Sequence, residues 1–120
     1  MATTTATITL ASTDLLSDEL SLTTTATLTG AGNSTGLTGT TGLGRKKLAS
    51  GHAQYTLFDG SDYTADKAHK LYLKNTSTTA AEYFEIEVNS EQIGRIYAGD
   101  WAFIPWMANA STNDIKIDPS

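Results

Sequence analysis

Few side chains in this chain of 120 residues have the types and spacing of a chemical site. The two histidines, His52 and His69, could bind a metal ion together with Asp62 or Asp66. A strand, however, presents ligands two residues apart on one face, whereas two other residues stand between Asp66 and His69. The spacing therefore predicts ordinary surface histidines, and we expect neither a bound metal ion nor a cofactor.

A second candidate is a pair of carboxylates. Glu85 and Glu87 lie on one face of the strand pattern EYFEIEV, and Lys70 and Lys74 lie on one face of KLYLKN. Folding the first lysine-bearing strand onto the second through residues 76–82 sets lysines opposite glutamates, which favours cross-strand ion pairs over acid–base catalysis. The sequence also has no nucleophile elbow, phosphate loop, dinucleotide fingerprint or calcium loop, so we expect no enzyme activity.

The remaining candidates are aromatic. Tyr97, Trp101, Phe103 and Trp106 could stack on sugar rings if they shared an exposed face. The alternation of a strand instead places Trp101 and Phe103 on one side and Trp106 on the other. A strand that is apolar on both sides is covered on both, by its own core and by a second sheet or a partner subunit. We expect Trp101 to belong to the core and Trp106 to face a partner.

Short strands must position these side chains. The stretch from Lys70 to Trp106 predicts two hairpins in a row, the first joining KLYLKN to EYFEIEV and the second joining IGRIY to WAFIPW through a turn at 98–100. One helical turn could begin at Ser12, but no long amphipathic helix is present. About eight short strands predict an all-β fold, an antiparallel β-sandwich or a jelly roll. The predicted strands lie at about 3–10, 20–29, 53–58, 70–74, 83–88, 93–97, 101–106 and 114–118.

The length predicts a single β domain over residues 1–120. Residues 1–50 are rich in threonine and glycine and form a flexible half of strands and loop, whereas residues 51–120 carry most aromatic residues and form the main core. Residues 30–44, GAGNSTGLTGTTGLG, predict either a long flexible loop or a weak edge strand softened by glycine. A loop of this length is functional, mobile or ordered by a neighbouring subunit, and we favour the last of these. We expect this segment to be mobile in the free subunit and protected in an assembly.

The composition excludes several classes of function. A net charge of −5 and a pI near 4.7 argue against a nucleic-acid partner, because such proteins need basic residues to displace counterions. The basic cluster at 45–47 is too short to change that conclusion. The chain has no cysteine, no signal-peptide pattern at residues 1–12 and no apolar run that would span a membrane. We therefore expect no disulfide and no membrane partner.

The stretch KLYLKNTSTTAAEYFEIEVNSEQIGRIYAGDWAFIPW resembles small virion structural proteins of tailed bacteriophages, especially phages of marine bacteria and cyanobacteria. Such proteins carry a strand of lysine, apolar, tyrosine, apolar, lysine and asparagine, here residues 70–75. A G-x-L/I-x-x-G-D/E stretch follows, here residues 94–100, and then an aromatic-rich strand that ends in proline. The resemblance covers roughly the C-terminal half. It implies a capsid decoration (cement) protein, oligomeric and commonly trimeric, with no catalytic residues.

The expected function is therefore that of a non-enzymatic virion structural protein, made in the host bacterial cytoplasm. As a homo-oligomer, with a trimer favoured, it would bind the major capsid protein on the capsid surface and stabilise the head. Two alternatives stay open: a head–neck or tail component, and a carbohydrate-binding or receptor-binding β-sandwich module. A small hydrolase is the weakest alternative, because no acid–base pair is placed. The candidate interface residues are Trp101, Phe103, Trp106, Tyr97, Leu37 and Leu43.

Overall fold

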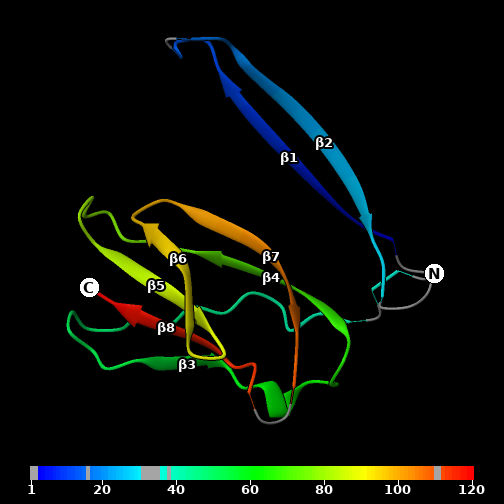
Figure 1. The fold of residues 1–120 in the computed structure, drawn as a ribbon, viewed down its shortest axis with the longest axis vertical. Helices are drawn as coiled ribbons and strands as arrows, with labels where there is room; N and C mark the ends of the chain where they lie inside the picture. The colour runs from blue at the N-terminus through cyan, green and yellow to red at the C-terminus, as the bar shows by residue number, and fades with distance from the viewer. Residues whose placement is uncertain (1–2, 16, 31–35, 38, 110–111) are drawn as a thin grey trace. The chain divides into compact units, whose positions relative to one another are not determined.

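This computed structural model describes residues 3–15, 17–30, 36–37, 39–109 and 112–120. Within them the regular structure consists of eight antiparallel strands and one short 3₁₀ turn, so the predicted all-β class is confirmed. The chain divides into two compact units, residues 1–42 and 43–120 (Figure 1). The division falls close to residue 50, where the sequence changes from threonine-rich to aromatic-rich. The two units are described in turn.

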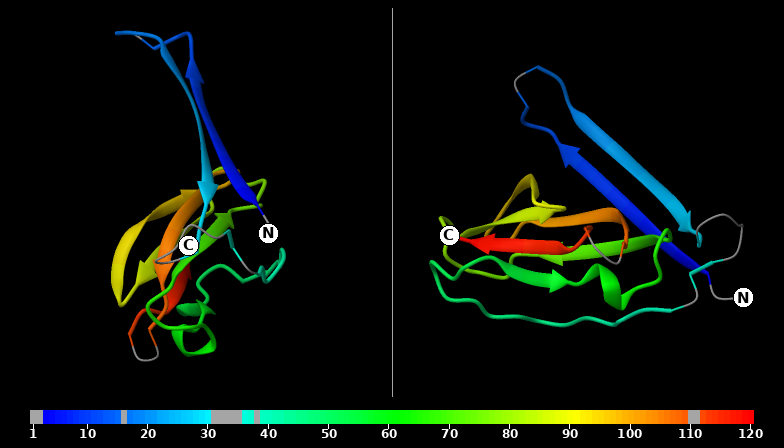
Figure 2. Two further views of the ribbon diagram at one scale, coloured as in Figure 1. Left: turned by 90° about the vertical axis from the view of Figure 1, so that its right-hand side faces the viewer. Right: turned by 60° about the horizontal axis from the view of Figure 1, so that its bottom comes forward.

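The first unit is an antiparallel hairpin. Strand β1 (Thr4–Ser12) pairs with strand β2 (Leu20–Leu28) along their whole length, and the right-hand view of Figure 2 shows them as one extended ribbon. Both strands confirm the prediction from alternating threonines. Ser12 belongs to β1, so the expected helical turn does not begin there. The prediction of a mobile segment at 30–44 falls partly on residues 31–35 and 38, which lie outside the described residues.

The second unit contains two antiparallel sheets. A four-stranded sheet has the order β3-β8-β5-β6, and a two-stranded sheet pairs β4 with β7. The 3₁₀ turn, Gly60–Asp62, follows β3 after Asp59, which caps it. The strands are β3 (Tyr55–Phe58), β4 (Ala68–Lys74), β5 (Tyr83–Val88), β6 (Glu91–Tyr97), β7 (Trp101–Met107) and β8 (Ile115–Pro119).

The core of this unit is built by both sheets. The alternation is clear in β4 and β8, where every second residue is buried, and each sheet contributes an apolar face to the core. The two faces meet in one cluster, which makes the unit a small β-sandwich; a jelly roll is not confirmed. Fully burying each large apolar side chain contributes about 1.5–3 kcal/mol. The buried cluster consists of Leu71, Leu73, Ile86, Ile96, Trp106, Ala108 and Ile115.

The strand pairing differs from the predicted hairpins. β4 pairs with β7, and β5 pairs with β6 and β8, so neither the predicted hairpin of β4 with β5 nor that of β6 with β7 exists. The reason lies in two turns. Asn89 and Ser90 both have positive φ, 52° and 64°, and close the two-residue turn that joins β5 to β6. The turn at 98–100, with Gly99 at φ 87°, instead carries the chain from one sheet to the other.

The predicted ion pairs between lysines and glutamates are wrong for the same reason. Glu85 pairs with Arg95 of the neighbouring strand β6. Glu87 is only 8% exposed, and its carboxylate accepts a hydrogen bond from Gln54. The register of β5 and β6 shifts between Ile86 and Glu87, so two successive residues of β5 are buried.

A buried amide joins the two sheets at one end. Asn75, which directly follows β4, donates from Nδ2 to the carbonyl groups of Ile96 (3.1 Å) and Glu82 (3.2 Å). Its Oδ1 accepts from the backbone N–H of Ser77 at 3.0 Å, and its own carbonyl accepts from Gly99 at 2.9 Å. The end of β4 is thus tied to the end of β6 and to the turn that leads into β7. A low-dielectric site strengthens such a network.

Two isoleucines beside the register shift test the sandwich. Ile86 is 4% exposed, whereas Ile93 is 57% exposed. Ile86→Ala is expected to lower the free energy of unfolding by about 2–5 kcal/mol, because it leaves a cavity in a small core. Ile93→Ala is expected to cost less than about 1 kcal/mol. Urea unfolding measures both, and equal losses would show that the two faces are assigned wrongly.

The Asn75 network gives a second prediction. Asn75→Ala removes three side-chain hydrogen bonds from a buried position and should destabilise the protein by about 1–3 kcal/mol. Thr76 is the matched control, because it is the next residue in the same loop and is exposed. Thr76→Ala should change the stability by no more than about 0.5 kcal/mol. A similar loss for both variants in thermal or urea unfolding would contradict a linking role for Asn75.

Candidate functional site: the outer face of β4 and β7

One face of the two-stranded sheet points away from the core. Leu71 and Leu73 of β4 and Trp106 of β7 are buried, so the residues that alternate with them point outward. The register sets Tyr72 opposite Phe103 and Lys74 opposite Trp101. We call this surface the β4–β7 outer face, and it consists of Ala68, Lys70, Tyr72, Lys74, Trp101, Phe103, Pro105 and Met107.

Large apolar groups are exposed on this face. Trp101, Tyr72 and Met107 are each about half exposed, at 50%, 49% and 49%. The rings of Tyr72 and Trp101 lie side by side, with centroids 6.3 Å apart and planes tilted by 38°. The only charged members are Lys70 and Lys74, so the face is apolar with a positive charge. Contiguous exposed apolar groups of this kind mark interaction sites.

Trp101 and Trp106 have the reverse of their predicted roles. Trp106 is 4% exposed, and its indole N–H donates to the carbonyl of Asn113 at 2.7 Å. Its ring packs edge-on against Tyr63, with centroids 5.2 Å apart. The cause is the register, since His69 lies opposite Trp106 and Leu71 lies opposite Ile104, all on the inward side of the sheet. Trp101 and Phe103 therefore point outward.

The other predicted interface residues lie elsewhere. Tyr97 belongs to β6, is 41% exposed and lies beside Tyr83, with ring centroids 5.3 Å apart. Leu43 is 92% exposed, and Leu37 is half buried within the unit of residues 1–42. Among the members of the β4–β7 outer face that the prediction omitted, Tyr72 and Met107 are large and half exposed. Tyr72 was recognisable from its place between Lys70 and Lys74 in an alternating pattern, whereas Met107 follows the end of the predicted strand.

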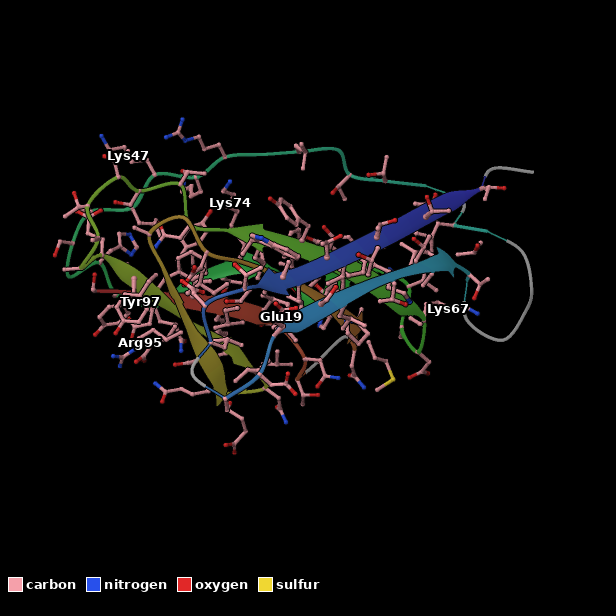
Figure 3. The ribbon with its side chains drawn as sticks, turned by 90° about the horizontal axis from the view of Figure 1, so that it is seen from above. Glu19, Lys47, Lys67, Lys74, Arg95 and Tyr97 are labelled. Atoms are coloured by element: carbon pink, nitrogen blue, oxygen red, sulfur yellow. The ribbon has the colours of Figure 1, made fainter. Side chains whose placement is uncertain are left out.

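A second polar cluster lies on β5 and β6, where Figure 3 shows Arg95 and Tyr97 close together. Arg95 lies 4.0 Å over the ring of Tyr83 and forms the ion pair with Glu85, which also accepts from Gln92 at 2.5 Å. The hydrogen bond to Tyr97, followed by the one to Glu85, raises the pKa of Arg95 above its usual range. These polar groups pair with one another, and the guanidinium covers the face of Tyr83. The cluster therefore offers few unpaired polar groups to a ligand.

The two histidines do not form a metal site with Asp62 or Asp66, the alternative that was considered from the sequence. His69 packs edge-on against Tyr63, with centroids 5.6 Å apart, and its Nε2 lies 3.0 Å from the carbonyl of Thr64. The His52 ring lies edge-on to Tyr55 at 6.1 Å. Among the residues that the structure describes, no three His, Asp or Glu side chains gather around a point that could hold a metal ion.

No protein family, curated protein or solved structure matches this chain. Across the described ranges, none of the regular structure is a helix of the length and apolarity needed to cross a bilayer.

The two tryptophans are the only ones in the chain, so fluorescence can distinguish them. In dilute solution, where the protein is monomeric, Trp101→Phe is expected to remove the emission that acrylamide quenches easily and to leave a blue-shifted, protected signal from Trp106. Trp106→Phe should do the opposite, and it should also lower the stability because it changes a packed core side chain. In the reversed arrangement, Trp101→Phe would leave the quenchable signal.

Proposed function

We propose that this protein is a non-enzymatic structural component of a phage virion, a decoration protein that binds the capsid surface as a homo-oligomer. The observation that carries the proposal is the β4–β7 outer face, where Tyr72, Trp101 and Met107 are half exposed beside Phe103. Contact with a second copy or with the capsid would cover these groups. A trimer is the favoured closed form, in keeping with the resemblance to phage virion proteins.

The chemistry of the face supports an assembly role. Tyrosine and tryptophan are the side chains that contribute most to binding at protein interfaces, because each buries a large rigid area with little loss of conformational entropy. Lys70 and Lys74 at the same face suit an acidic partner surface. A face with both features binds through apolar burial and selects its partner by charge.

The position of the phage-like motifs supports the proposed role as a virion protein. Residues 70–75 form β4 and the loop residue Asn75, and residues 94–100 form the end of β6 and the turn into β7. The aromatic strand is β7 itself. These three motifs thus contribute most of β4 and β7, which form the outer face, and the turn that leads into β7.

A carbohydrate-binding module is the second candidate function. The observation that favours it is the pair of half-exposed rings, Tyr72 and Trp101, which lie 6.3 Å apart on one surface. Adjacent aromatic rings of this kind can stack on sugar rings. In that case the face would stay free of other protein and take an oligosaccharide.

Mass in solution and capsid binding test the proposal. The wild-type protein is expected to form an oligomer by light scattering as its concentration is raised and to sediment with empty heads of the phage that encodes it. Tyr72→Glu should weaken the assembly at least tenfold, because it places a charge in an apolar contact. The control is Ile93→Glu, an exposed change on strand β6, which should have little effect. A monomer that ignores heads, and whose tryptophan emission shifts with oligosaccharides, would replace the proposal with the carbohydrate-binding function.

A further inference from the structure

The β1–β2 hairpin has two chemically different faces. Thr7 lies opposite Thr25 and Thr9 lies opposite Thr23, and each pair is linked by a side-chain hydrogen bond, at 2.8 Å and 3.4 Å. The residues that alternate with them form the other face. We call it the apolar hairpin face, and it consists of Ala6, Ile8, Leu10, Leu20, Leu22, Ala26 and Leu28 with Thr4, Ser12 and Thr24 at intervening positions.

Much of the apolar hairpin face is left uncovered by the described residues of its own unit, although Ala6, Ile8 and Leu28 are partly buried. Leu10, Leu20 and Leu22 are 45%, 42% and 47% exposed, and all of β2 except Leu28 is exposed. An isolated two-stranded hairpin is at best marginally stable in water. A nine-residue ribbon of this kind needs an apolar surface against it to stay ordered, and the exposed leucines show which side that surface must contact.

The charges of the hairpin identify a matching surface. Residues 1–44 contain three charged side chains, Asp14, Asp18 and Glu19, and no lysine or arginine. All three lie in the loop between β1 and β2, and Glu19 directly precedes β2 (Figure 3). The β4–β7 outer face is mostly apolar, and its only charged side chains are lysines. Lys74 lies at one end of this face, opposite Trp101. An apolar ribbon with an acidic tip therefore complements an apolar face with a lysine at its end.

We propose that the apolar hairpin face of one copy of this chain packs on the β4–β7 outer face of a second copy. The inference rests on the proposed homo-oligomer and names the contact that holds it together. The acidic tip lies beside Lys74, so Leu22 and Leu10 lie over Tyr72 and Phe103. The two sheets pack face to face, as in a sandwich assembled from two chains.

The two faces match in length, and the area that they would bury together is small. The seven-residue strands β4 and β7 make a face about 23 Å long and about 10 Å wide, and the nine-residue hairpin is about 30 Å long, so it covers that face. One contact removes roughly 460 Å² from water, below the roughly 1,000 Å² of a specific interface. A closed ring in which every copy gives one hairpin and receives another leaves no such face open. We therefore expect weak assembly that depends on protein concentration.

Cross-linking between differently sized copies tests the contact. The chain has no native cysteine, so introduced thiols report only on the chosen positions. Copies with Leu22→Cys are mixed with copies that carry Tyr72→Cys and a size tag, and a short bis-maleimide is added. The expected product joins one copy of each kind. The matched control is Thr23→Cys, on the threonine face, which should give at least tenfold less product.

A charge exchange tests the orientation in the same assay. Lys74→Glu should lower the yield several-fold, because it faces the acidic tip with a like charge, and adding Asp18→Lys in the partner copy should restore it. Equal yields from Leu22→Cys and Thr23→Cys, or no restoration, would overturn the inference. So would a product formed only within a chain that carries both cysteines. If the protein is an oligomer but Leu22→Cys and Tyr72→Cys copies do not cross-link, the inferred contact is wrong and the proposed function stands. If the protein is a monomer at all concentrations, the inferred contact and the proposed function are both wrong.

Discussion

A two-stranded antiparallel ribbon exposes two faces to water, and it folds stably only when apolar groups cover at least one of them. The chain contains two such ribbons, β1–β2 and β4–β7. The four-stranded sheet covers the inner face of β4–β7, where Leu71, Leu73 and Trp106 are buried. Leu10, Leu20 and Leu22 of β1–β2 have no equivalent cover from the described residues of the first unit. The interaction surfaces of this protein follow from that difference.

The sequence predicted the strands better than it predicted their partners. Alternation is a local property, so the threonines of residues 4–12 and the leucines of β4 located strands that the structure confirms. Pairing depends on turns, and the decisive turn is Asn89-Ser90, where a serine takes a positive φ that glycine more often takes. Without that turn, β4 and β5 looked like neighbours. Leu71 and Ile86 do share one core, but they meet across the sandwich rather than along a hairpin.

The candidate site was predicted in part, for the same physical reason. Trp101 and Phe103 were placed correctly on one side of their strand, because side-chain alternation is fixed by the pleat. Which side faces the core is decided by the sheet that packs against it, and no local pattern contains that information. The predicted roles of Trp101 and Trp106 were therefore reversed. Tyr72 could be assigned to the outer face only once the pairing of β4 with β7 was known. The buried amide of Asn75 fixes that pairing at the end where Lys74 and Trp101 meet.

The place of β8 has a consequence for synthesis on the ribosome. β8 follows β3, β5 and β6 in the chain, yet it lies between β3 and β5 in the sheet. Its Ile115 has no exposed surface and Ile117 is nearly buried. While the chain is translated, β5 and β6 can close at once through their two-residue turn, but β3 has no neighbour until β8 has left the exit tunnel. Sandwich formation is thus delayed to the end of this segment, and the nascent chain displays unpaired strand edges until then.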